Sequence, residues 1–217
     1  MKKIKRKPSR LHRALRAAAV MLCAAVLYLF LADAKLTPMM AVHMLEEFHG
    51  IYEETHVVAS CGTQAGRRYY LMAGENALLC AEVDRHGLFW QDTNGTVLDC
   101  SDGERIHAGW WDMARNGVRD IFYWGRVDDA AVTSAEVERY RAVLQDENGD
   151  YTFEKREAFA AELIEDGDYR YFLTGGVATE ANYGDYGWDR VYFVGYDASG
   201  AEVLRYEIER QMSTSFA

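Results

Sequence analysis

The sequence predicts a mainly β protein, in which an antiparallel β-sandwich or open barrel-like domain follows an N-terminal transmembrane or signal helix and a short linker helix. Three observations support this prediction. An uncharged run follows a basic tail, apolar residues alternate with polar ones from about residue 52 onward, and turn-forming dipeptides separate the alternating segments.

Charge divides the chain sharply near its N-terminus. Residues 1–16 carry eight Lys or Arg side chains and no acidic one, whereas the chain after residue 32 carries 16 basic and 34 acidic residues, a net charge of −18. Such an asymmetry marks a targeting segment. We therefore interpret residues 1–16 as a basic cytoplasmic tail.

The segment 17–34 is the predicted transmembrane or signal segment. Residues 17–32 carry no charge, and as a helix they would extend about 24 Å, close to the roughly 30 Å of a bilayer core. They therefore predict membrane contact, as an uncleaved single-pass anchor or as a signal peptide. Cleavage near Ala34, after the Ala32-Asp33-Ala34 pattern, would give a secreted protein. The positive-inside rule places the N-terminus in the cytoplasm and the C-terminal domain outside, in the cell envelope.

Residues 35–50 predict a linker helix. Thr37 supplies an N-cap oxygen and Pro38 suits the first helical position. Met40, Met44 and Phe48 recur every four residues and so share one face, and a glycine at residue 50 ends the pattern.

Residues 51–217 predict the extracytoplasmic β-rich domain. Residues 169–174 and 202–208 alternate in the period of a half-buried strand. Residues 121–124 and 190–196 are apolar at successive positions, which is typical of central strands.

Turn signals agree with this interpretation but leave two alternatives open. Asn94-Gly95 predicts a tight hairpin between residues 89–91 and 97–99, and Ser199-Gly200 predicts another between the last two strands. Residues 155–164 could instead form a short helix, which would give an α+β fold. The domain could also be subdivided near residues 100–120.

Cysteines raise the question of a disulfide. The exported part contains three, Cys61, Cys80 and Cys100. In an oxidising compartment one disulfide among them is the plain expectation, with one free thiol left over. The alternative is that these thiols lie buried and unpaired within strands.

Catalytic and metal-binding motifs are not recognisable in the sequence. There is no G-x-S-x-G, S-x-x-K or C-x-x-C pattern, and His43, Glu46 and His49 do not have the spacing of a metalloprotease helix. We therefore expect no enzyme activity, no metal and no cofactor.

The segment from residue 175 to residue 189 is long for a hairpin connection and contains Tyr183, Tyr186 and Trp188. Long loops often carry function, so these three aromatic residues are the candidate binding residues. The alternative is that their rings fold back onto the edge of the sandwich.

A pattern in the second half of the chain resembles a known group of proteins. It consists of an aromatic strand entering residues 125–129, then residues 132–137, Tyr171-Phe172-Leu173, and residues 194–200 before a final strand. The pattern is similar to short, membrane-anchored or secreted bacterial β-rich proteins that are largely uncharacterised. The resemblance implies a β fold and an envelope location, and it carries no catalytic residues.

These observations predict a noncatalytic, membrane-anchored extracytoplasmic protein that contacts another envelope protein. An aromatic-surfaced binding module for a glycan or small ligand is the alternative. Nucleic acid is not an expected partner, because a domain of net charge −18 repels phosphate.

Topology gives the first testable prediction. Protease added to intact spheroplasts should digest residues 36–217 and leave the N-terminal tail protected, because the basic residues hold that tail in the cytoplasm. Immunoblotting with tags at the two ends measures the outcome. A domain that resists protease until the cells are lysed would contradict the predicted orientation.

Overall fold

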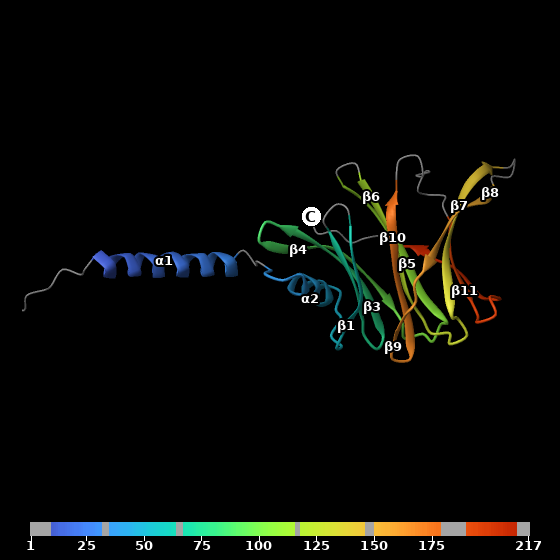
Figure 1. The fold of residues 1–217 in the computed structure, drawn as a ribbon, viewed down its shortest axis with the longest axis horizontal. Coiled ribbons are helices and arrows are strands. Elements are labelled where there is room, and N and C mark those ends of the chain that lie inside the picture. The colour runs from blue at the N-terminus through green and yellow to red at the C-terminus, as the bar shows by residue number, and fades with distance from the viewer. Residues whose placement is uncertain are drawn as a thin grey trace, which may run out of the picture.

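A computed structural model describes the chain in six ranges: residues 10–31, 35–63, 67–115, 118–145, 150–178 and 190–211. Within these ranges the protein has two helices followed by strands that form three separate sheets (Figure 1). The mainly β fold class, the N-terminal helix and the short second helix are confirmed.

Helix α1 (Arg10–Leu31) is a single 22-residue helix, and it stands apart from the β domain (Figure 1). Within it, Arg10–Leu29 is the one helix among the described residues that is long and apolar enough to cross a membrane. Helix α2 (Pro38–Phe48) begins as predicted, because the Thr37 side chain accepts a hydrogen bond of 3.2 Å from the Met40 backbone N–H.

The first sheet is an antiparallel meander of consecutive strands in the order β1-β2-β3-β4. Its strands are β1 (His56–Gly62), β2 (Arg68–Ala73), β3 (Ala77–His86) and β4 (Phe89–Asp99).

The strands of the second and third sheets alternate along the sequence, so the chain passes repeatedly from one of these sheets to the other. The second sheet, in the order β13-β5-β6-β10-β9, contains β5 (Ile106–Arg115), β6 (Val118–Val127), β9 (Ile164–Asp166), β10 (Tyr169–Ala178) and β13 (Glu209–Arg210). The third sheet, in the order β12-β11-β7-β8, contains β7 (Ser134–Gln145), β8 (Tyr151–Ala161), β11 (Arg190–Tyr196) and β12 (Glu202–Glu207). All pairings are antiparallel except that of β13 with β5.

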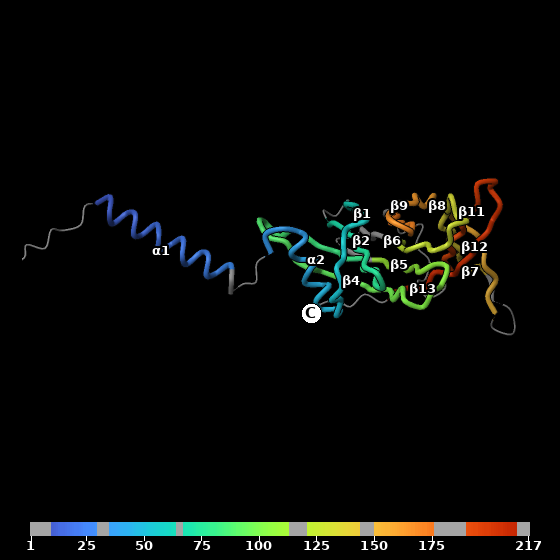
Figure 2. The backbone as a smooth tube through the Cα atoms, turned by 90° about the horizontal axis from the view of Figure 1, so that it is seen from below, coloured from blue at the N-terminus to red at the C-terminus, as the bar shows by residue number. Residues whose placement is uncertain are grey.

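The domain is a stack of layers in the order α2, first sheet, second sheet, third sheet (Figures 1 and 2). Three hydrophobic clusters fill the spaces between neighbouring layers. One joins α2 to the first sheet through Leu45 and Leu79, and a second joins the first and second sheets through Leu71 and Trp124. The third cluster joins the second and third sheets and includes Phe193.

The second sheet is covered on both faces, so its strands are apolar at successive positions. In β6, Phe122 and Trp124 face the first sheet, whereas Ile121 and Tyr123 face the third. Successive side chains of a strand point to opposite faces, and the run at 121–124 therefore has the pattern of a strand buried on both sides, as predicted.

Close packing leaves no room for a side chain at one position of this strand. A Cβ atom on Gly125 would lie 2.6 Å from the His107 carbonyl oxygen and 2.6 Å from a ring carbon of Phe172. Glycine therefore leaves room within the second sheet for the backbone of β5 and the Phe172 ring of β10, the two strands that pair with β6.

The prediction of a hairpin turn at Asn94-Gly95 is wrong. Both residues lie inside β4, where Gly95 pairs with Ala81, and the chain turns instead at Gly87 and Leu88. Gly95 allows close contact with the C-terminal end of α2, since a Cβ atom there would lie 3.2 Å from His49 Nε2 and 3.3 Å from a Leu45 methyl carbon. The turn at Ser199-Gly200 is confirmed, with φ of +83° at Gly200.

The alternative of an α+β fold is also decided by the described residues. Residues 155–161 continue strand β8 and do not form a helix, and β8 pairs with β7 along its length. The possible subdivision near residues 100–120 stays a prediction. The cluster between the first and second sheets combines Tyr69 and Leu71 with Trp111 and Phe122, from the two sides of this region.

We expect Gly125→Ala to lower the free energy of unfolding by about 1–3 kcal/mol, because the added methyl group overpacks the space beside Phe172. Urea unfolding of the detergent-solubilised protein measures the change. Gly62→Ala is the matched control, since a Cβ atom there would meet only one atom, the Arg67 carbonyl oxygen at 3.9 Å. Equal stability of the two variants would contradict this account of the packing.

Candidate functional site

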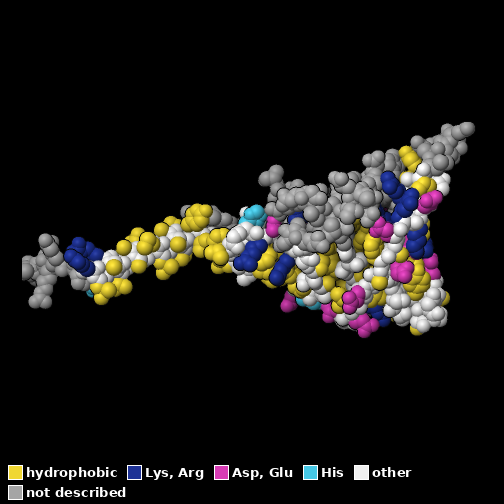
Figure 3. Space-filling model, turned by 45° about the horizontal axis from the view of Figure 1, so that its top comes forward, with side chains coloured by type: hydrophobic (Ala, Val, Ile, Leu, Met, Phe, Trp, Pro, Cys, Tyr) yellow, Lys and Arg dark blue, Asp and Glu magenta, His cyan; other side chains and the backbone are white. Residues whose placement is uncertain are grey.

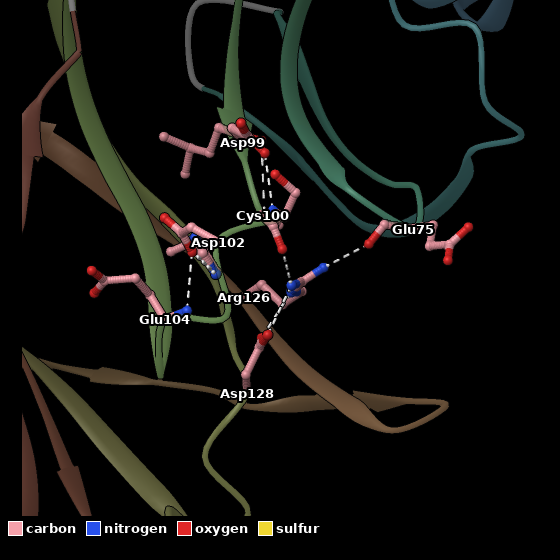
Figure 4. A network of polar contacts seen from close by, with 10 residues as sticks. Glu75, Asp99, Cys100, Asp102, Glu104, Arg126 and Asp128 are labelled. Carbon is pink, nitrogen blue, oxygen red and sulfur yellow. Dashed lines mark hydrogen bonds and ion pairs between the residues drawn. The ribbon is translucent and has the colours of Figure 1, made fainter.

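Two networks of charged side chains stand out among the described residues, and they differ in exposure. The first surrounds Arg126 on β6, whose side chain is 3% exposed. Its guanidinium donates hydrogen bonds to the carbonyl oxygens of Glu75 and Cys100, at 3.1 and 2.8 Å, and to both carboxylate oxygens of Asp128 (Figure 4). The Tyr169 ring lies 4.3 Å from the guanidinium carbon.

The Arg126 network is structural. It ties the β2–β3 turn and the end of β4, both in the first sheet, to the second sheet. Burial lowers the pKa of the Arg126 guanidinium, but the hydrogen bonds to Asp128 and the electrostatic attraction of Asp128 and other neighbouring groups together outweigh it, so the net shift of the pKa is upward. A buried cation already bonded to three residues has little capacity left for a ligand.

The second network, the Glu138 cluster, lies on the outer face of the third sheet, at the end of the stack farthest from α2 (Figure 1). It consists of Glu138, Tyr140, Lys155, Tyr192 and Arg205. These residues come from four strands and are brought together by cross-strand pairing, for example of Glu138 with Tyr192.

Glu138 is the centre of this cluster, and its side chain is only 5% exposed. The carboxylate accepts hydrogen bonds from the Tyr140 hydroxyl at 3.0 Å, from Arg205 Nη1 at 2.9 Å and from the Lys155 ammonium. Burial raises the pKa of Glu138, but the hydrogen bonds from Lys155, Arg205 and Tyr140 outweigh it, so the net shift of the pKa is downward.

Aromatic rings border the charged centre. Tyr140 and Tyr192 meet edge to face with centroids 5.4 Å apart, and the guanidinium of Arg205 lies 5.7 Å from the Tyr192 ring. Arg205 is also held in a two-bond pair by Glu202, at 2.8 and 3.0 Å. These contacts fix the orientations of Arg205, which is exposed, and of Tyr192, which is half-buried.

This arrangement suits recognition better than acid–base chemistry. A general acid or base needs a pKa near the working pH, whereas the pKa of Glu138 is lowered and its carboxylate already accepts three donors. The cluster therefore presents fixed Tyr and Arg side chains, which are the residue types that dominate binding surfaces.

The histidine and glutamate residues of α2 form no metal centre. Glu46 accepts hydrogen bonds from Thr55 and pairs with His43, so its carboxylate stabilises the segment after α2. The residues that the structure describes contain no group of three or more His, Cys, Asp or Glu side chains placed to hold a metal ion.

The cysteines form no disulfide in the structure, where all four lie within the described ranges. Cys61 is on β1 and Cys80 on β3, and β2 lies between these strands. Two strand spacings, about 9.6 Å, exceed the roughly 7 Å limit between the Cα atoms of a disulfide. The disulfide stays a prediction, and the strand order disfavours a Cys61–Cys80 bridge. Burial raises the pKa of the Cys100 thiol to about 12, which makes it unreactive.

The candidate residues Tyr183, Tyr186 and Trp188 lie outside the described residues, so their role in binding stays a prediction. The sequence did not indicate the Glu138 cluster. Its one signal was the alternation of polar and apolar residues in 134–140, which places Glu136, Glu138 and Tyr140 on one face of a strand.

Comparison with family models, with curated proteins and with solved structures gave no match to this chain. The resemblance to short bacterial envelope proteins therefore stays a prediction. What can be proposed about function depends on the fold and on the Glu138 cluster.

We expect Glu138→Gln to lower the free energy of unfolding at neutral pH by about 1–3 kcal/mol, because three donors lose a charged acceptor. The pKa of Glu138 is lower in the folded than in the unfolded chain, so its stabilisation is full above the unfolded pKa and is lost as pH falls through the folded pKa.

Urea unfolding between neutral pH and about pH 3 tests this sign, since carboxylates titrate in this window. The difference between wild type and Glu138→Gln should shrink toward low pH. Glu202→Gln, which alters an exposed partner of the same arginine, should change stability little. A difference that is independent of pH would contradict the role given to the Glu138 charge.

Proposed function

We propose that this chain is a noncatalytic, membrane-anchored protein whose extracytoplasmic domain binds another protein of the cell envelope. Helix α1 supports the anchoring, because it is long and apolar enough to cross a membrane and follows a basic tail. The net charge of −18 beyond residue 32 opposes binding to nucleic acid.

This proposal rests on the ordered side chains of the outer face of the third sheet. The three hydrophobic clusters lie between neighbouring layers, whereas the Glu138 cluster faces away from the stack. Tyr140, Tyr192 and Arg205 are held there by the contacts described above. Side chains that are ordered before binding lose less conformational entropy when a partner docks.

The edge of the third sheet is a less suitable contact surface than its face. The edge strand β8 carries Glu154, Lys155, Arg156 and Glu157 in succession. Charged residues along an edge strand oppose pairing with a strand of another chain. We therefore propose contact through side chains of the face and not through an added strand.

We expect a partner to copurify with the tagged, full-length protein from solubilised membranes and to be lost from Tyr192→Ser. Removing the ring takes away a large contact area at the centre of the face. Mass spectrometry of captured proteins measures the outcome, and melting curves check that the variant remains folded. Tyr52→Ser is the matched control, because Tyr52 is 88% exposed on a different part of the domain.

Retention of every specific partner by a folded Tyr192→Ser variant would contradict binding through this face. Binding of the wild type to a glycan array, lost in the same variant, would instead support the alternative of an aromatic-surfaced module for a glycan or small ligand.

A further inference from the structure

Helix α2 is apolar on two faces, but only one of them is covered. Ala41, Val42 and Leu45 are fully buried against the first sheet. Along another side of α2, Met40 (45%), Met44 (36%) and Phe48 (55%) recur every four residues and remain exposed, next to the exposed polar residues His43 and Glu47. Leu36, two residues before the helix, is 58% exposed. A solvated helix normally places polar residues on such a face.

The chain holds this apolar face close to the end of α1. Three residues separate Leu31, the last residue of α1, from Lys35, and the Lys35 carbonyl oxygen accepts a hydrogen bond of 2.8 Å from the Trp90 N–H. Three intervening residues span at most about 14 Å. The start of α2 and the β3–β4 turn are therefore fixed beside the point where the chain leaves α1.

The β3–β4 turn adds to the same apolar surface. Leu88 lies at the tip of this turn and is 77% exposed. Hydrophobic side chains are visible along α1 and again at the adjacent end of the domain, next to Lys, Arg and His side chains (Figure 3).

Basic side chains gather at this end of an otherwise acidic domain. Arg85 and His86 are exposed directly before the turn, and Arg68 lies 5.5 Å from the Trp90 ring. The acidic residues of the same turn are largely engaged, since Asp92 pairs with Lys35 and Asp84 with His86. The exposed charge here is suited to anionic headgroups.

We infer that α2 lies flat on the anionic surface of the bilayer that α1 enters, with Met40, Met44, Phe48 and Leu88 inserted between headgroups and acyl chains. An amphipathic helix with one apolar face binds the interface in this manner. This inference rests on the anchoring proposed above. It would orient the stack with its layers parallel to the membrane and the third sheet outermost.

Site-specific photo-crosslinking of the full-length protein in vesicles tests this inference. The vesicles contain phosphatidylcholine and phosphatidylglycerol, and p-benzoylphenylalanine replaces Phe48, Val26 or Thr152 in separate variants. Position 26 in α1 is the positive control, and position 152, exposed on β8, is the negative control. Mass spectrometry should detect lipid adducts at positions 26 and 48 and none at position 152.

The controls separate the failure of this inference from the failure of the anchoring. Lipid adducts at position 26 with none at position 48 overturn the docking of α2 and leave the anchor intact. Loss of lipid adducts at position 26 overturns the anchor as well. Adducts between two copies of the chain at position 48 overturn the lipid contact and assign this face to a dimer.

The lipid composition tests the charge argument separately. Omitting phosphatidylglycerol should reduce the yield of adducts at position 48 and leave the yield at position 26 unchanged. An unchanged yield at position 48 overturns the role assigned to Arg85 and His86.

Discussion

Burial of the second sheet on both faces is the constraint on which the rest of the fold depends. A sheet in this position has no solvent-exposed face, so β6 carries Phe122, Tyr123 and Trp124 in succession, and its buried Arg126 is held by hydrogen bonds. The layers on either side must then supply matching apolar faces. The third sheet does so with the inward residues of alternating strands, and the first sheet with β2 and β3, which are buried at successive positions because α2 covers their other face.

The two outward faces of the stack have opposite character. The first sheet is covered by α2 through Leu45 and Leu79, and α2 then presents Met40, Met44 and Phe48 outward. The outer face of the third sheet is polar and aromatic and is organised by the buried carboxylate of Glu138. An apolar end and a polar aromatic end are what we expect of a domain that rests on a membrane and binds a partner on its far side.

The two arginine networks differ in exposure, in line with the structural role of Arg126 and the binding role that we propose for the surface around Arg205. Arg126 is enclosed and holds the first and second sheets together, so its hydrogen bonds contribute to stability. Arg205 is also paired with carboxylates, but it remains exposed beside Tyr192. Pairing of an arginine with carboxylates thus joins two sheets at Arg126 and orders an exposed surface at Arg205.

Local patterns in the sequence were sufficient for the fold class, for the helix beginning at Thr37-Pro38 and for the doubly buried strand at 121–124. They failed where a contact between residues far apart in the sequence determines the local structure. Asn94-Gly95 has the residues of a tight turn, but packing of α2 against Gly95 and pairing with β3 keep the chain extended there. Glu138 and Tyr192 are 54 residues apart and meet only through strand register, which the sequence does not specify without knowledge of strand order.

The interleaving of the second and third sheets has a consequence for biogenesis. The first sheet contains consecutive strands and can form as soon as residues 56–99 have emerged, because its contacts are local. The second sheet is completed only when Glu209 pairs with Gly109, near the end of the chain. Ile121 and Tyr123 of β6 face the third sheet, and they have no complete layer to cover them until β12 has joined that sheet. With the topology that we propose, the chain would need shielding from aggregation until its last strand has crossed the membrane.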